Sequence, residues 1–251
     1  MPHGDEIIDI PNEHSRKLNS EISKLAGTDN SDVIVVLSPH GINLSKNIGI
    51  INTERFLSDT KLKSVHLRDY WENERKLCEN IIRESGDIGE EVRYATYSGE
   101  ESVFPMDFGT SIPLYFFKKR PIVLIGQSRS IGRHSQKEFG MHLARTLMNY
   151  EKSVSIIFSA DQAHTHSADG PYGYSQEAEV YEEKLKRCIE HNNFGEMEEI
   201  DQDIVDQAKP DSFWNILVMS RFLSESKRKM RFVYGYVERY FGMFLAISDK
   251  E

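Results

Sequence analysis

Segment 33–37, Val-Ile-Val-Val-Leu, constrains the fold of this chain more than any other stretch. Five consecutive apolar residues, four of them β-branched, predict a strand buried on both faces, as in the parallel sheet of an α/β protein. The turn Ser38-Pro39-His40-Gly41 follows directly. Because ligands bind at the carboxyl ends of strands in such sheets, the turn places His40 where a functional side chain is expected.

The rest of the chain repeats this alternation of apolar strands and amphipathic helices. Segments 121–126 and 154–160 are further apolar runs, 91–97 alternates as a half-buried strand, and the tail from 232 to 247 has the composition of two strands or one long interrupted strand. Apolar spacing predicts helices at 13–26, 70–85, 136–150, about 175–193 and 200–207. We therefore expect an α/β fold: a single domain with a central, largely parallel or mixed sheet flanked by helices.

Composition narrows the classes of function. No apolar run approaches 18 residues, and no basic segment followed by an apolar stretch opens the chain, so we expect a soluble, cytoplasmic protein without a membrane span. The net charge of −9 argues against nucleic-acid binding, and the basic cluster at 227–231 is interpreted as a basic helix end or a solvated loop. Cys78 and Cys188 lie far apart, and we interpret both as buried or incidental thiols.

Histidines in turns are the strongest candidates for chemistry. His3 lies in a second Pro-His-Gly turn, and His164 and His166 follow the apolar run at 154–160. Two imidazoles and one carboxylate with open positions suit non-haem Fe(II), whereas three histidines favour Zn(II). From spacing alone, a metal site and purely structural histidines remain equal alternatives.

Several blocks of the sequence resemble the class III extradiol ring-cleavage dioxygenases, the LigB-like superfamily, which also includes Memo-like proteins. The blocks occur in the same order and at similar intervals, and together they extend over nearly the whole chain. They are Ser38-Pro39-His40-Gly41, Asp107-Phe108-Gly109-Thr110-Ser111-Ile112-Pro113-Leu114, Ser159-Ala160-Asp161-Gln162-Ala163-His164 and the loop at 170–174.

This resemblance implies one LigB-like domain over 1–251 with an Fe(II) site, and Zn(II) as the alternative metal. His3 and His40 match the family's two histidine ligands, and His164 matches its acid/base residue. The third ligand, a glutamate in the family, aligns with Asp211 or Ser212. Ser212 would be a poor iron ligand, and Asp211 could instead act as a helix N-cap.

The resemblance also implies a small aromatic substrate and O₂ as partners. The residues that we expect in the substrate pocket are Asp107, Phe108, His166 and Tyr174. Other aromatic side chains could line the same pocket or belong to the core: Phe104, Phe116, Phe117 and Tyr172.

Two departures from the family pattern bear on function. Phe108 stands where the family commonly has a histidine, and only Met1-Pro2 precedes His3, where the family has a first strand. Either that edge of the sheet is missing or the true start lies upstream.

The leading hypothesis is an Fe(II)-dependent enzyme that opens catechol-type rings with O₂. The alternatives are a non-catalytic, Memo-like binding protein and a zinc-dependent hydrolase. The sequence leaves open whether the chain forms a homo-oligomer.

Overall fold

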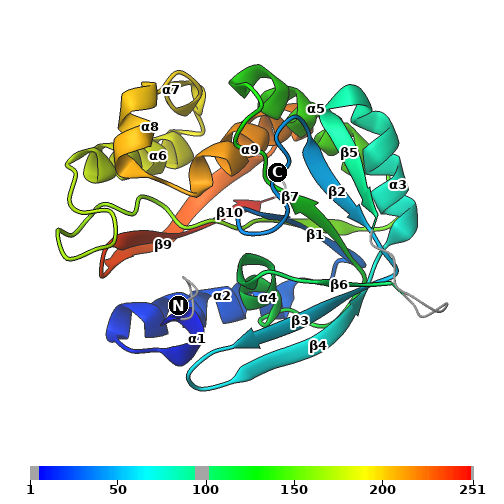
Figure 1. Cartoon of the computed structure of the whole chain (residues 1–251), viewed down its shortest axis with the longest axis horizontal. Helices are drawn as coiled ribbons and strands as arrows, with labels where there is room; N and C mark the ends of the chain where they lie inside the picture. Colours follow the sequence, from blue (N-terminus) through cyan, green and yellow to red (C-terminus); the bar gives the residue numbers. More distant parts are fainter. Residues whose placement is uncertain (1–5, 94–101, 250–251) are drawn as a thin grey trace.

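The computed structural model describes residues 6–93 and 102–249, and its centre is a five-stranded sheet of order β5-β2-β7-β1-β8 (Figure 1). The strands of this sheet are β1 (Val33–Ser38), β2 (Ile48–Asn52), β5 (Gly89–Arg93), β7 (Ile122–Gly126) and β8 (Val154–Phe158). β7, β1 and β8 are parallel, β2 is antiparallel to β7, and β5 is parallel to β2. The expected α/β fold with a mixed, largely parallel sheet flanked by helices is confirmed.

Alternation along β1 explains why helices cover both sides of the sheet. Val33, Val35 and Leu37 pack against α3, α5 and α9, while Ile34 and Val36 face α4 and a smaller sheet (Figure 1). The bounds of these helices are α3 (Arg75–Glu84), α4 (Phe108–Leu114), α5 (Arg133–Met148) and α9 (Ser212–Ser226). Burial on both faces accounts for the unbroken apolar run of the strand.

Two smaller sheets extend the molecule. β3 (Arg55–Lys61) pairs with β4 (His66–Glu72) and β6 (Val103–Pro105), and β9 (Lys229–Glu238) forms a hairpin with β10 (Phe241–Asp249). Of the two alternatives for the tail, two strands is therefore correct. The remaining elements are α1 (Glu6–Asp9), α2 (Glu13–Thr28), the 3₁₀ turn η1 (Gly86–Ile88), α6 (Glu177–His191), α7 (Gly195–Glu198) and α8 (Gln202–Ala208).

The predicted helix at 70–85 is wrong in its first turn. Residues up to Glu72 belong to β4, where Trp71 lies opposite Phe56 of β3 and both side chains are buried, and the helix begins at Arg75. The pairing with β3 overrides the helical spacing of the local sequence. Of the predicted strand at 91–97, the part up to Arg93 lies in β5, and 94–97 falls outside the described residues.

Within the described ranges, no helix has the length and apolar content needed to cross a membrane.

Candidate metal centre

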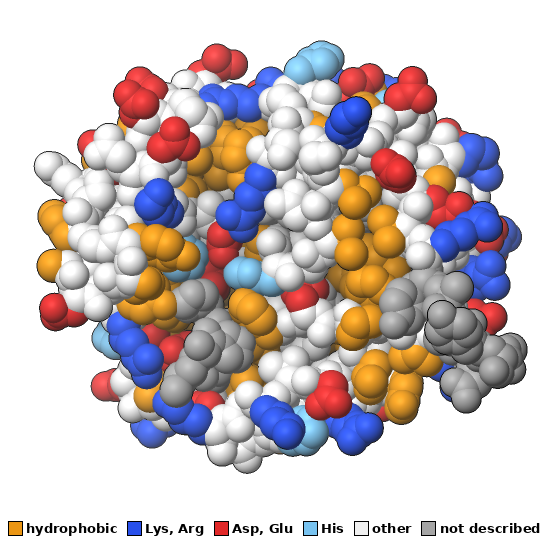
Figure 2. Space-filling view, in the orientation of Figure 1, with side chains coloured by type: hydrophobic (Ala, Val, Ile, Leu, Met, Phe, Trp, Pro, Cys, Tyr) orange, Lys and Arg blue, Asp and Glu red, His pale blue; other side chains and the backbone are white. Residues whose placement is uncertain are grey.

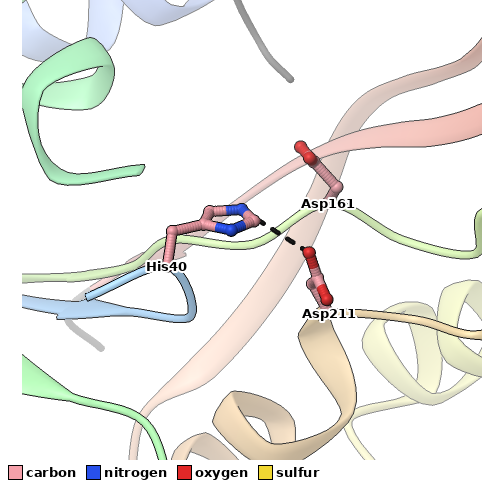
Figure 3. A group of neighbouring side chains, drawn as sticks. All are labelled: His40, Asp161 and Asp211. Atoms are coloured by element: carbon pink, nitrogen blue, oxygen red, sulfur yellow. Dashed lines mark ion pairs between the residues drawn. The ribbon is translucent and has the colours of Figure 1, made fainter. Parts of the chain in front are cut away.

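His40, Asp161 and Asp211 converge at the carboxyl edge of the central sheet (Figure 3). Each offers one ligand atom, and these atoms all lie within 4.8 Å of one another; His40 Nε2 is 3.5 Å from Asp211 Oδ2. His40 follows β1 and Asp161 follows β8, and because these strands are parallel neighbours their carboxyl ends meet. Asp211 precedes the first residue of α9.

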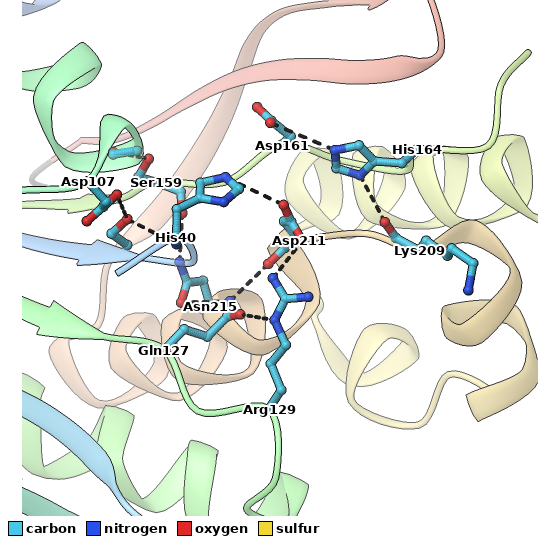
Figure 4. Close-up of polar contacts among 12 residues, drawn as sticks. His40, Asp107, Gln127, Arg129, Ser159, Asp161, His164, Lys209, Asp211 and Asn215 are labelled. Carbon is cyan, nitrogen blue, oxygen red and sulfur yellow. Dashed lines mark hydrogen bonds and ion pairs between the residues drawn. The ribbon is translucent and has the colours of Figure 1, made fainter. Parts of the chain in front are cut away.

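Asp211 occupies the N-cap position of α9, but its side chain makes no capping hydrogen bond. Its Oδ1 instead accepts from Arg129 Nη2 at 2.6 Å, and the Arg129 Nε donates to Gln127 Oε1 at 2.9 Å. Gln127 closes the ring by donating to the Asp211 carbonyl at 2.9 Å (Figure 4). This arrangement fixes the carboxylate and leaves Oδ2 directed at His40.

Asp161 is a buried carboxyl group. Its Oδ2 has no hydrogen-bond partner among the described residues, and His164 Nε2 is 3.9 Å away. Burial, and then the charges of Asp211 and Glu6, raise the Asp161 pKa to about 8. A buried carboxylate needs a positive partner to remain ionised, and a bound cation would supply it.

His40 is held as a neutral imidazole. Burial lowers its pKa, an effect that Asp211 and Asp107 oppose. The Phe108 ring covers the imidazole at a centroid distance of 4.2 Å. A neutral ring keeps a nitrogen lone pair available for a metal ion.

Asp107 and Phe108 position this face of the site from the start of α4. Asp107 is the N-cap, accepts from the Thr110 N–H at 3.1 Å, and accepts from the Ser38 hydroxyl at 2.5 Å. Because Pro113 has no N–H, the Gly109 carbonyl lacks its intrahelical donor and accepts instead from the Ser159 hydroxyl, at 2.6 Å. α4 is thereby joined to the ends of β1 and β8.

His164 lies beside the cluster, and its ring contacts Asp161 on one side and the Lys209 carbonyl on the other (Figure 4). Its Nδ1 is 2.9 Å from the Lys209 carbonyl oxygen, which can only accept, so Nδ1 carries the proton. In the neutral ring Nε2 therefore holds the lone pair, and it faces Asp161. The ring packs between Tyr172, at 6.1 Å, and Phe241, at 5.9 Å.

The other predicted site residues lie elsewhere. His166 Nε2 is 2.8 Å from Glu182 Oε1, and both side chains are largely buried, so this histidine has a structural partner. Tyr174 is more than half exposed, and its backbone forms an isolated antiparallel β-bridge with that of His166. His3 falls outside the described residues, and its role as a ligand stays a prediction.

Asp161, Gln127 and Arg129 were not predicted as site residues from the sequence. Asp161 comes three residues after the end of β8, Arg129 comes three residues after the end of β7, and Gln127 directly follows β7. Their position after predicted buried strands, the criterion that selected His40, was the signal available for all three.

A cavity of about 900 Å³ opens beside the cluster, and His40 and Asp161 are part of its wall. Phe108, which was predicted to lie in the substrate pocket, also lines it, as does Phe117, for which pocket and core were the two alternatives. Figure 2 shows this face, where histidine and acidic side chains gather near the centre among hydrophobic patches.

The donor set fits a divalent cation. One imidazole nitrogen and two carboxylate oxygens come from three separate segments, and ligands bound to one ion at about 2.1 Å lie roughly 3–4 Å apart. The buried Asp161 Oδ2, which has no hydrogen-bond partner in the described part of the chain, is an independent observation that favours a cation here. Nitrogen and carboxylate donors of this kind suit Fe(II), Mn(II) and Zn(II) alike.

Comparisons with known proteins agree with this fold. The chain is 31% identical over 111 residues to Protein CA_C1420 of Clostridium acetobutylicum; the matched segment is 43% of this chain but only 23% of the clostridial protein. The crystal structure of uncharacterized protein JW3007 from Escherichia coli K12 has the same fold, with a TM-score of 0.65, 15% identity and 90% of each chain covered. Residues 3–246 match the family described as the catalytic LigB subunit of aromatic ring-opening dioxygenase. The chain belongs to the LigB family.

Proposed function

We propose that this protein is a metal-dependent extradiol dioxygenase that opens a catechol-type aromatic ring with O₂ at the His40/Asp161/Asp211 cluster. The convergence of these three ligand atoms within 4.8 Å supports the proposal most directly. Fe(II) is the proposed metal, and His3 is proposed as a further ligand.

The residues of the chain divide into two roles in this proposal. His40, Asp161 and Asp211 hold the cation, which when bound would supply the redox chemistry with O₂ and a positive charge for the substrate oxygens. His164 accepts the proton of a substrate hydroxyl at Nε2, because the Lys209 carbonyl keeps the other ring nitrogen protonated.

Phe108 and Arg129 shape the surroundings of the metal ligands. Phe108 excludes water from one face of His40, and the lining of the adjoining cavity is mainly apolar, as an aromatic ring requires. Arg129 fixes the orientation of the Asp211 carboxylate, so this carboxylate keeps its own orientation beside the second charged ligand, Asp161.

The test is oxygen uptake by protein loaded anaerobically with Fe(II) and offered a panel of catechols. We expect O₂ consumption and a yellow ring-fission product, both lost in His40→Ala and reduced at least about 100-fold in His164→Gln. His134→Ala is the matched control, because that side chain is 91% exposed on α5, and it should retain full activity.

Three outcomes would contradict the proposal. Stoichiometric iron without turnover of any catechol would count against the dioxygenase. Failure to bind any divalent metal would remove the metal site itself and favour the Memo-like binding protein. Zinc retained through purification, with ester or amide hydrolysis that chelation abolishes, would favour the hydrolase.

A further inference from the structure

Hydrogen bonds to α8 hold both the backbone and the ring of His164. The His164 N–H donates to Ala208 O at 2.8 Å, and the hydroxyl of the next residue, Thr165, donates to Gln207 O at 3.0 Å. Both acceptors lie in the last turn of α8, and Lys209, whose carbonyl accepts from His164 Nδ1, directly follows them. The carboxyl end of α8 therefore fixes one part of the surroundings of His164.

Glu182, in the middle of α6, contacts residues that come before and after His164 in the sequence. One oxygen of its carboxyl group, Oε1, accepts from the Ala163 N–H at 3.2 Å and lies 2.8 Å from His166 Nε2. Because a carboxylate oxygen only accepts hydrogen bonds, the imidazole of His166 donates through Nε2. Glu182 thus joins the residue directly before His164 to the second residue after it.

Packing against β10 fixes the carboxyl group of Glu182. The residue is 7% exposed, and a Cβ at Gly242 would overlap Glu182 Oε1, so the close fit at this position requires glycine. Gly242 also binds the segment that carries His164: its N–H donates to Ala163 O at 3.0 Å, and its carbonyl accepts from the Gln162 N–H at 2.9 Å. The acceptor oxygen of Glu182 is therefore held by packing as well as by its two donors.

His164 and His166 carry their protons on opposite ring nitrogens. The Lys209 carbonyl keeps the proton of His164 on Nδ1, whereas Glu182 Oε1 keeps a proton of His166 on Nε2. Which nitrogen of a neutral imidazole carries the proton is set by the hydrogen bonds of the ring. A shift of the backbone at 163–166 would therefore break the contact between His164 Nδ1 and the Lys209 carbonyl and release the control over the tautomer.

We propose that Glu182 is a positioning residue for His164. By holding Ala163 and His166, it keeps the imidazole between them aligned with its acceptor carbonyl, so the lone pair stays on Nε2 and faces Asp161. This role rests on the proposed function, in which His164 accepts the proton of a substrate hydroxyl. Proton transfer requires the base within hydrogen-bond reach of the proton, and a displacement of about 1 Å can slow catalysis about 100-fold.

Two substitutions separate the position of the acceptor oxygen from its charge. Glu182→Gln keeps an oxygen at the same reach and removes the charge, whereas Glu182→Asp keeps the charge and withdraws the oxygen by roughly 1.5 Å, the length of one carbon–carbon bond. In the Fe(II)-loaded protein, Glu182→Asp should lower kcat at least about tenfold and change KM less than about threefold, because the base acts in the transition state. Glu182→Gln should retain at least about a third of the original kcat.

Glu183→Ala is the matched control, because Glu183 is the exposed neighbour of Glu182 on α6, and its kcat and KM should equal those of the original chain. Equal losses of kcat in Glu182→Gln and Glu182→Asp, or no loss in either, would overturn the proposal.

The ring nitrogens of His164 give a readout that needs neither metal nor turnover. Long-range ¹H–¹⁵N spectra of the metal-free, histidine-labelled protein at pH 8 show which nitrogen carries the proton, and the His164 signals are identified by their loss in His164→Gln. We expect the proton on Nδ1 in the original chain and in Glu182→Gln, and a mixture of both tautomers in Glu182→Asp. An unchanged tautomer in Glu182→Asp would overturn the proposal. If the original chain turns over no catechol, the proposed function fails, and these spectra still test the position of His164.

Binding of Mn(II) separates an effect on His164 from an effect on Asp161. The affinity, measured by isothermal titration calorimetry, should stay within about threefold of the original in both Glu182 variants, because Asp161 comes before the segment that Glu182 holds. An affinity that falls as much as kcat would assign the effect to Asp161 and overturn the proposal. If Glu182→Asp fails to fold, Glu182→Met, which keeps a similar side-chain volume and has no acceptor oxygen, takes its place with the same expected results.

Discussion

Arg129 Nη2 lies 2.6 Å from Asp211 Oδ1, while the other oxygen of that carboxylate faces His40 Nε2 at 3.5 Å. The two oxygens of Asp211 therefore have different tasks: one is held by the guanidinium and the other is directed at the candidate metal position. Partners outside the metal ligands commonly tune affinity in this way.

Arg129→Lys should weaken binding of Mn(II) about tenfold, because lysine keeps the charge but cannot contact Asp211 and Gln127 together. Isothermal titration calorimetry measures the affinity. Arg145→Lys is the control, because Arg145 pairs with Glu225 at an exposed position on α5, and its affinity should be unchanged. Equal affinities for all three proteins would show that Arg129 does not position Asp211.

Asp161→Asn should have opposite effects on the metal-free and metal-bound protein. Burial raises the Asp161 pKa to about 8, so at pH 7.5 the folded state must either bury a charge or take up a proton. Because both cost free energy, replacing the carboxyl group should stabilise the metal-free chain by about 2 kcal/mol. This gain should shrink as the pH falls toward about 4, where the unfolded carboxyl is also protonated. Thermal unfolding at pH 5 and 7.5, with and without Mn(II), measures both effects.

The same variant should lose the stabilisation that Mn(II) gives to the original chain, since an amide is a poorer ligand than a carboxylate. Asp87→Asn, at an exposed position, should behave like the original chain in every condition. A destabilised metal-free Asp161→Asn protein would contradict the account of this carboxyl.

The local sequence predicted the strands and most helices, because the spacing of apolar residues shows which faces of these elements are buried. His40 could be predicted for the same reason, because its turn follows a strand with an unbroken apolar run. Asp161 was not predicted, because its importance depends on β8 lying next to β1 and on α9 bringing in Asp211, contacts between residues 50 or more positions apart. The prediction that Trp71 lies in a helix was wrong because Trp71 pairs with Phe56 of β3, and the local sequence does not show this pairing.

Gly140→Ala should destabilise the protein by about 2 kcal/mol. A Cβ at this position of α5 would lie 2.1 Å from the Val218 carbonyl oxygen, so the close packing of α5 on α9 would have to open. Urea unfolding measures the change. Gly27→Ala is the matched control within α2, where a Cβ meets nothing within 4 Å, and it should be neutral or stabilising by about 0.5 kcal/mol. Similar losses in both variants would contradict the packing argument.

Cys78 should resist alkylation in the folded protein. It is fully buried, and burial raises its thiol pKa to about 12, so at pH 8 only about one molecule in 10,000 carries the reactive thiolate. Iodoacetamide labelling of Cys188→Ser, followed by mass spectrometry, isolates this thiol. Labelling should become rapid only in urea, and fast labelling of the folded chain would contradict the observed burial.

The candidate metal centre can be tested directly by an anomalous difference map from crystals of this protein soaked with Mn(II). We expect one strong peak about 2.0–2.3 Å from His40 Nε2, from an Asp161 carboxylate oxygen and from Asp211 Oδ2. A map without a peak at this position, or with the metal bound only elsewhere, would contradict the assignment of the His40/Asp161/Asp211 cluster as the metal centre.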